Sequence, residues 1–169
     1  MVDDASLRQL PAAAQRVQKA LLALGVDASV VELPSSTRTA VDAANAVGCS
    51  VQQIVKSLVF RSDSGTPILV LASGTNRVDV ALVSSHLGTA LGKADADFVR
   101  STTGFAIGGV PPVGHSQTIM TFIDQDLLAL ETLWAAGGTP HTVFALTPQQ
   151  LVHATGGRVI PVSERSQPQ

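Results

Sequence analysis

The start of the chain has the hydrophobic pattern of an amphipathic helix. From Leu7 to Leu24, apolar residues recur every three or four positions, which places them on one face of a helix. Ser6 can cap this helix and Gly25 can end it. The run at residues 28–33 is rich in β-formers and predicts a strand.

Short strands and short helices are predicted over the rest of the chain. A helix begins at Thr39, where Asp42 three positions later gives a pattern that resembles a capping box, and Gly48 ends it. A polar turn that ends in Gly65 joins two apolar runs and predicts a β-hairpin. The expected strands are residues 54–60, 68–72, 118–123, 132–136, 142–146 and 158–162; the expected helical segments are a turn at 51–53 and helices at 78–87, 95–102 and 147–155.

The order of these elements predicts the fold class. Many strands follow one another without a crossover helix, which favours an α+β (mixed α/β) sheet closed on itself over a doubly wound sheet. The chain has 169 residues, about the size of one domain, and no repeat or internal linker divides it. We therefore expect a single domain over residues 1–162 and a flexible C-terminal tail at residues 163–169.

The composition excludes several classes of protein. Apolar residues make up 45% of the chain and charged residues 14%, which excludes an intrinsically disordered chain. A net charge of −2 argues against a histone-like coat for nucleic acid, and no DNA partner is expected. No membrane partner is expected either, because no run reaches the ~18 apolar residues of a membrane span. The acidic N-terminus is not a secretory signal, and the lone Cys49 excludes a disulfide scaffold and fits a cytoplasmic location.

Common catalytic and cofactor motifs are absent from the sequence. There is no GxxxxGK[ST] phosphate loop, no GxGxxG at a strand-to-helix turn and no GxSxG nucleophile elbow. There is also no CxxC or HExxH pattern, and the four histidines are far apart. The sequence therefore predicts neither a metal nor a cofactor, and Cys49 is interpreted as a small apolar filler.

Lys56 stands out because it lies inside an apolar strand. Alternation along the strand places Lys56 on the same face as Leu58 and Phe60, and places Ser57 on the opposite face. The bland interpretation is a strand-end lysine whose ammonium extends to water. The sharper interpretation is a cation in a pocket, which offers hydrogen-bond donors to an anion or to a polarised carbonyl.

A segment rich in glycine and proline, residues 104–115, is the second unusual feature. Gly108 and Gly109 allow backbone N–H groups to approach a ligand closely, and such groups can form an oxyanion hole. Pro111 and Pro112 stiffen the segment, which lowers the entropy lost on binding. A tight structural connection between two strands explains the same residues equally well.

In combination, these two features resemble the YbaK/ProXp family of aminoacyl-tRNA deacylases, which is related to the editing domain inserted in bacterial prolyl-tRNA synthetases. The resemblance covers residues 13–162. It rests on the strand QIVKSLVF with Lys56, followed by the pattern TGF-x-IGG-x-x-P with Gly108. Thr39 at a helix start, Gly74 at the end of ILVLASG and the late glycine pair at residues 137–138 also match.

The resemblance implies a strongly bent, barrel-like mixed β-sheet surrounded by helices. It also implies hydrolysis of the ester that joins a wrong amino acid to the 3′ adenosine of a tRNA. In the family, the lysine of this strand contacts the aminoacyl-adenosine and the glycine segment supplies backbone groups to the aminoacyl end. These roles fall on Lys56 and on Gly108 with Gly109. Thr39 falls where family members vary the residues that shape the amino-acid pocket.

Gly74, Pro112 and His115 are the remaining candidates for substrate binding, and His115 alternatively braces the loop. Some relatives have a carboxylate in the strand after the glycine pair, whereas residues 142–146 contain no acid. This departure argues against a cysteine-specific, YbaK-like selectivity. The Thr39–Ala40 pair leans towards alanyl-tRNA(Pro) as the substrate.

The sequence thus predicts an aminoacyl-tRNA deacylase (a carboxylic ester hydrolase) that edits in trans, without a cofactor. Its substrate would be mischarged tRNA-Pro bearing a small amino acid such as Ala, Cys or Ser. With Lys19, Lys93 and the arginines as its other cations, the chain is expected to contact mainly the tRNA 3′ end and to bind the tRNA body weakly and in a salt-sensitive manner. A synthetase as a further partner stays open. The alternatives are a non-catalytic adaptor module that retains the pocket and a hydrolase of another small ester.

Overall fold

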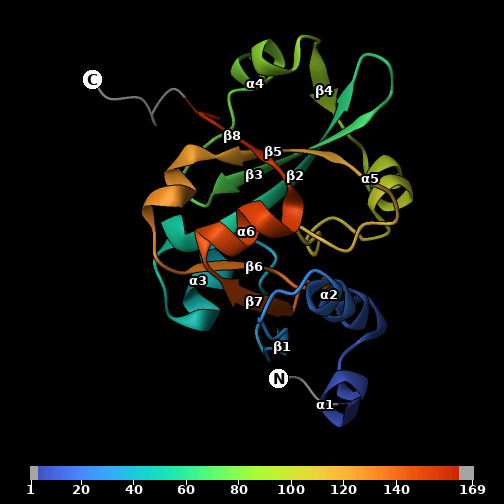
Figure 1. Ribbon diagram of the computed structural model, residues 1–169, viewed down its shortest axis with the longest axis vertical. Coiled ribbons are helices and arrows are strands. Elements are labelled where there is room, and N and C mark those ends of the chain that lie inside the picture. The colour runs from blue at the N-terminus through green and yellow to red at the C-terminus, as the bar shows by residue number, and fades with distance from the viewer. Residues whose placement is uncertain (1–3, 164–169) are drawn as a thin grey trace.

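The computed structural model describes residues 4–163, which form a mixed α/β fold with six α-helices and one eight-stranded mixed sheet (Figure 1). Apart from Ser163, the expected C-terminal tail lies outside the described residues. The helices are α1 (Asp4–Gln9), α2 (Ala12–Ala23), α3 (Ala40–Val47), α4 (Val80–Leu87), α5 (Ala96–Thr103) and α6 (Pro148–Thr155), with short 3-10 helices η1 (Val51–Gln53) and η2 (Gln125–Ala129). The strands are β1 (Val31–Glu32), β2 (Ile54–Ser62), β3 (Pro67–Ser73), β4 (Leu91–Lys93), β5 (Met120–Asp124), β6 (Leu133–Ala136), β7 (Thr142–Leu146) and β8 (Arg158–Ile160).

Strand β2 is the most connected strand of the sheet, whose order is β1-β7-β6-β2-β3-β5-β8. It forms the predicted antiparallel hairpin with β3, and β4 pairs with its far end. Its first residues pair in parallel with β6. These pairings leave β1 and β8 as the two ends of the sheet, so they do not show the barrel-like curl that the resemblance implies.

The predicted alternation along β2 is confirmed, because its two faces contribute to different hydrophobic clusters. Val55 is buried in the main core, which also includes Leu69 and Leu71 of β3, and Val59 packs against that core. Phe60, on the opposite face, packs against a second cluster around α4. In Figure 1, α4 lies near β4 at one end of the molecule, while α1 and α2 lie at the other.

The helix signals in the sequence are confirmed at the start of α3. Thr39 has extended backbone angles, and its hydroxyl accepts a hydrogen bond from the N–H of Asp42 at 3.0 Å. Gly48 ends the helix in the left-handed region, at φ 79°. This well-defined helix start fixes the position of residues 37–39, which line the cavity described below.

Two of the expected elements differ from the structure, and one further strand is present. The single N-terminal helix is two helices, because Pro11 has extended backbone angles and acts as the N-cap of α2; Ser6 lies inside α1 rather than before it. The expected strand at residues 28–33 is reduced to β1, since only two of its residues pair with β7. Strand β4 was not expected; its three residues pair with the end of β2. Among the described residues, no helix is long and apolar enough to cross a membrane.

Candidate functional site

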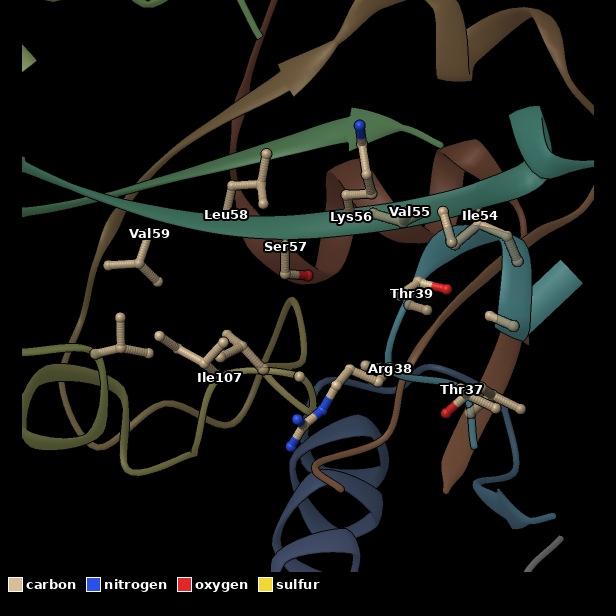
Figure 2. Close-up of a pocket in the computed structure, with 18 of the residues that line it drawn as sticks. Thr37, Arg38, Thr39, Ile54, Val55, Lys56, Ser57, Leu58, Val59 and Ile107 are labelled. Atoms are coloured by element: carbon tan, nitrogen blue, oxygen red, sulfur yellow. The ribbon is translucent and has the colours of Figure 1, made fainter. Parts of the chain in front are cut away.

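A cavity of about 550 Å³ lies along β2, on the side where the strand faces the glycine segment (Figure 2). Its size is typical of small-molecule sites. The start of α3, strands β2, β6 and β7, and the glycine segment at Ile107, Gly108 and Val110 all contribute to its walls. The apolar lining residues are Ala40, Ala43, Ile54, Val55, Leu58, Val59, Phe60, Ala94, Val99, Ile107, Val110, Trp134, Ala135, Ala136 and Val143.

The cavity has the form of a trough that follows β2. It is lined by every residue of the strand from Ile54 to Phe60, a stretch of roughly 20 Å at the usual rise of a β-strand. Trp134 pairs with Ile54 at one end, and Lys93 pairs with Phe60 at the other. The trough is therefore long enough for an extended ligand rather than a single small group.

The polar groups in the cavity are hydroxyls and cations. The hydroxyls of Thr37 and Ser57 are buried and have no hydrogen-bond partner in the described part of the chain. Figure 2 shows Ser57 on the side of β2 that faces Ile107 and Arg38. Among residues 4–163, those that line the cavity include no carboxylate and no imidazole. A buried hydroxyl without a partner is costly, so a ligand that hydrogen-bonds to Thr37 or Ser57 gains free energy there.

The ammonium of Lys56 is turned away from the glycine segment. Lys56 is one of the lining residues of the cavity, but Figure 2 shows its side chain on the opposite side of β2 from Ser57. Its Nζ donates a hydrogen bond to the backbone oxygen of Asn76 at 2.5 Å. Burial lowers the pKa of the Lys56 ammonium, and the nearby Asp124 carboxylate partly offsets this effect.

A buried polar network holds the acceptor of Lys56 in place. Asp124 is fully buried, and its carboxylate accepts hydrogen bonds from the Ser73 N–H at 3.0 Å and from the Asn76 side-chain amide at 2.8 Å. The same amide of Asn76 donates to Asp126 at 2.7 Å. These contacts fix the loop after β3, and with it the backbone oxygen that Lys56 contacts.

Of the two predicted glycines, Gly108 lines the cavity and Gly109 does not. Gly108 has a φ of +96°, and among the described residues no hydrogen bond uses its N–H. The N–H of Gly109 instead donates to the oxygen of Ala106 at 3.1 Å, which closes a turn. A Cβ at Gly109 would lie 2.7 Å from the Cα of Thr139, so close backbone packing explains this glycine.

Gly74, Pro112 and His115 lie outside this cavity. A Cβ at Gly74 would lie 2.1 Å from the oxygen of Val51, so its place is dictated by packing against η1. Pro112 and His115 line a second, more open cavity of about 410 Å³. A ring nitrogen of His115 hydrogen-bonds to the oxygen of Pro111 at 2.7 Å, and burial lowers the pKa of its imidazole. The structure thus places His115 as a brace of the loop.

Helix α2 holds the beginning of the glycine segment. The Arg16 guanidinium donates to the oxygen of Gly104 at 2.8 Å and lies 4.4 Å from the ring centre of Phe105. His115 meets the other side of this cluster, edge-on to Phe105 with 6.4 Å between the ring centres. This packing keeps Gly108 in a fixed position opposite β2.

Of the residues predicted from the sequence, the structure brings Thr39, Lys56 and Gly108 to one cavity. Thr37, Arg38 and Ser57 also line it and were not among the predicted site residues. Ser57 had one signal in the sequence, a polar residue on the valine face of an apolar strand. Thr37 and Arg38 precede the helix and gave no signal of their own.

Comparison with known proteins identifies the family. The profile of the aminoacyl-tRNA editing domain matches residues 34–154, which include the whole cavity. The chain belongs to this family. The resemblance predicted from the Lys56 strand and the Gly108 segment is therefore confirmed.

Similar proteins support the assignment to the editing-domain family. A crystal structure described as a candidate trans-editing enzyme for prolyl-tRNA synthetase is 49% identical, with a TM-score of 0.87 over 92% of this chain and 99% of that one. The structure of hypothetical protein APE2540 is 31% identical, with a TM-score of 0.82 over 88% of this chain and 99% of that one. The uncharacterised protein YwhH of Bacillus subtilis is 31% identical over 72% of this chain and 78% of that protein.

Within the described residues, no group of three or more His, Cys, Asp or Glu side chains could hold a metal ion. The groups that the described residues offer to a ligand in the cavity include hydroxyls, one backbone N–H and cations. These groups can orient an ester and a water molecule, and can hold negative charge that develops on an oxygen.

Proposed function

We propose that this protein is a trans-editing hydrolase that removes a small amino acid, such as Ala, Cys or Ser, from mischarged tRNA-Pro. Membership of the editing-domain family supports an aminoacyl-tRNA substrate. The likeness to a candidate trans-editing enzyme for prolyl-tRNA synthetase supports the choice of tRNA. The observation that carries the proposal is the apolar cavity in which the N–H of Gly108 and the hydroxyl of Ser57 both lack a hydrogen-bond partner within residues 4–163.

The proposed reaction is attack of water on the carbonyl carbon of the aminoacyl ester. The bond between this carbon and the ribose oxygen breaks, the ribose oxygen takes up a proton, and the free amino acid leaves. The N–H of Gly108 stabilises the negative charge on the carbonyl oxygen, a contact that contributes ~3 kcal/mol in comparable sites. Because the ester is already activated, orientation of water and ester by the Ser57 and Thr37 hydroxyls supplies much of the remaining effect.

The end of the cavity that β7 forms favours a small, uncharged amino acid. Val143 of β7 lines the cavity, and none of the lining residues is acidic. A cationic or strongly polar side chain would lose its hydration there without gaining a charged partner. Alanine fits this environment best among the expected substrates.

In this proposal Lys56 is a positioning residue. Its ammonium donates to the Asn76 backbone oxygen on the side of β2 opposite Ser57, so it holds the strand and the loop after β3 in place and does not contact the substrate. Loss of one such hydrogen bond costs about 1 kcal/mol, a small part of the stability of a typical domain. Lys56→Ala is therefore expected to slow deacylation without unfolding the protein.

The test is deacylation of a panel of preformed aminoacyl-tRNAs by the wild type and by Lys56→Ala. The proposal requires at least one mischarged tRNA to be hydrolysed faster by the wild type than by the variant. If none is, but a non-hydrolysable aminoacyl-adenosine analogue binds tightly, the protein is an adaptor module. If a small aminoacyl ester is hydrolysed equally well without the tRNA body, the protein is a hydrolase of another ester.

A further inference from the structure

Arg38 is a cation of the cavity lining that lies against Gly108. Its side chain lies flat against Gly108, since a Cβ at that glycine would lie 2.8 Å from the Arg38 Nε and 3.2 Å from its Cγ. Figure 2 shows Arg38 across the cavity from Ser57. The guanidinium therefore stands beside the backbone N–H that the proposed function assigns to the carbonyl oxygen.

The guanidinium of Arg38 has no partner within the described part of the chain. The side chain is exposed, and the one hydrogen bond of the residue is made by its backbone N–H to the hydroxyl of Ser36. Two other exposed arginines, in contrast, make side-chain contacts within the protein. Arg16 packs on Phe105 and contacts Gly104, and Arg61 lies 5.0 Å from the ring centre of Phe98. Arg38 is thus held against the loop while all its donors stay available.

The cavity has a positive lining in a chain of net charge −2. In the part of the chain that the structure describes, the charged lining residues are Arg38, Lys56 and Lys93, and none of the lining residues has a carboxylate to balance them. Lys56 is directed to Asn76, which leaves Arg38 at the glycine segment and Lys93 at the far end of β2. A ligand that fills the trough meets these two exposed cations, and an anionic group is the natural complement.

We propose that Arg38 binds the phosphodiester that precedes the 3′-terminal nucleoside of the substrate. Lys93, at the Phe60 end of the trough, assists in binding the RNA end. The inference rests on the proposed function, since it assumes that the aminoacyl group lies beside Gly108. The planar guanidinium can donate two parallel hydrogen bonds to a phosphate, which an ammonium cannot do. The contact supplies affinity for the RNA end without any dependence on the amino acid.

The experiment compares two non-hydrolysable probes by calorimetric titration. The first is 3′-aminoacylamido-adenosine, which has no phosphate; the second carries the same group at the end of a trinucleotide RNA. Arg38→Ala is expected to weaken trinucleotide binding about tenfold relative to nucleoside binding. It is also expected to lower the salt slope of trinucleotide binding by about one. Arg38→Lys is expected to restore part of the affinity.

The matched control is Arg158→Ala, which removes an exposed arginine from β8, three strands away from β2. This variant is expected to bind both probes like the wild type. Equal losses on both probes in Arg38→Ala, or no loss on either, would overturn the proposal. Because these titrations measure binding without turnover, a failure of the proposed function can be distinguished. In that case the wild-type protein binds the trinucleotide but hydrolyses no aminoacyl-tRNA.

Discussion

Replacing Gly108 by alanine separates the role of the glycine segment in catalysis from its role in folding. Gly108 has a φ of +96°, and the space beside it is occupied by the side chain of Arg38. An added methyl group therefore strains the backbone and also displaces Arg38. Gly88 is the matched control, because it has a similar φ of +88° and no atom within 4 Å of an added Cβ.

The size of each effect follows from this geometry. A left-handed backbone costs a residue with a Cβ about 1–2 kcal/mol, and this cost is common to Gly108→Ala and Gly88→Ala. The second effect is confined to Gly108, where the new Cβ meets the Arg38 Nε at 2.8 Å. Because the contact is with a flexible side chain, Arg38 moves aside and the added loss of stability is small. Alanine keeps the backbone N–H, but the strained backbone displaces it, and misplacing a well-placed oxyanion donor reduces the rate of ester hydrolysis by about 10²-fold or more.

The two variants are compared by urea unfolding and by single-turnover deacylation of the same mischarged tRNA. Both are expected to lose similar free energy of unfolding, and only Gly108→Ala is expected to lose deacylation. The reasoning is refuted if Gly108→Ala is destabilised as much as Gly88→Ala and yet deacylates at the wild-type rate. Gly108 would then be a turn residue outside the chemistry.

Two further predictions concern Ser57 and His115. Ser57→Ala is expected to slow deacylation and to keep or raise the free energy of unfolding, because its buried hydroxyl has no partner among the described residues. The control is Ser73→Ala, which loses a 2.7 Å hydrogen bond to the backbone oxygen of Gln52. It is expected to lose about 1 kcal/mol in the same urea titration. If both serine variants deacylate at the wild-type rate, Ser57 is not part of the site. Burial lowers the pKa of His115 below its ordinary 6.5, so the unfolded chain binds the proton more readily and stability falls as the pH drops through that value. Urea unfolding of the wild type and His115→Gln over the same pH range checks this, and parallel pH profiles would contradict it.

Much of the fold could be predicted because local signals agree with the tertiary structure. The Thr39 cap and the β2–β3 hairpin are specified by nearby residues. Strand β4 could not be predicted in this way, since its three residues become a strand only by pairing with the end of β2. The hydrophobic pattern does not reveal the break at Pro11, because the apolar spacing continues across it, although a proline fixes its own φ and lacks an N–H donor.

The sequence predicts only part of the site, because local patterns do not show which segments meet in the fold. Alternation correctly divided β2 into a Lys56 face and a Ser57 face, but it cannot show which face the glycine segment covers. The structure shows that this face carries Ser57, and that the Lys56 ammonium contacts Asn76 on the other side. Gly109 and Gly74 have the freedom expected of ligand-binding glycines, yet close backbone neighbours account for both. Such contacts between distant segments have no local signature in a sequence.

The most direct test of the central claim is single-turnover hydrolysis of preformed Ala-tRNA-Pro beside cognate Pro-tRNA-Pro. If the cavity along β2 is an editing site, the wild-type protein releases alanine far faster than buffer does, and Ser57→Ala and Gly108→Ala release it more slowly. Proline is released at the rate in buffer. Release of alanine, cysteine and serine from tRNA-Pro at the buffer rate alone would contradict the account.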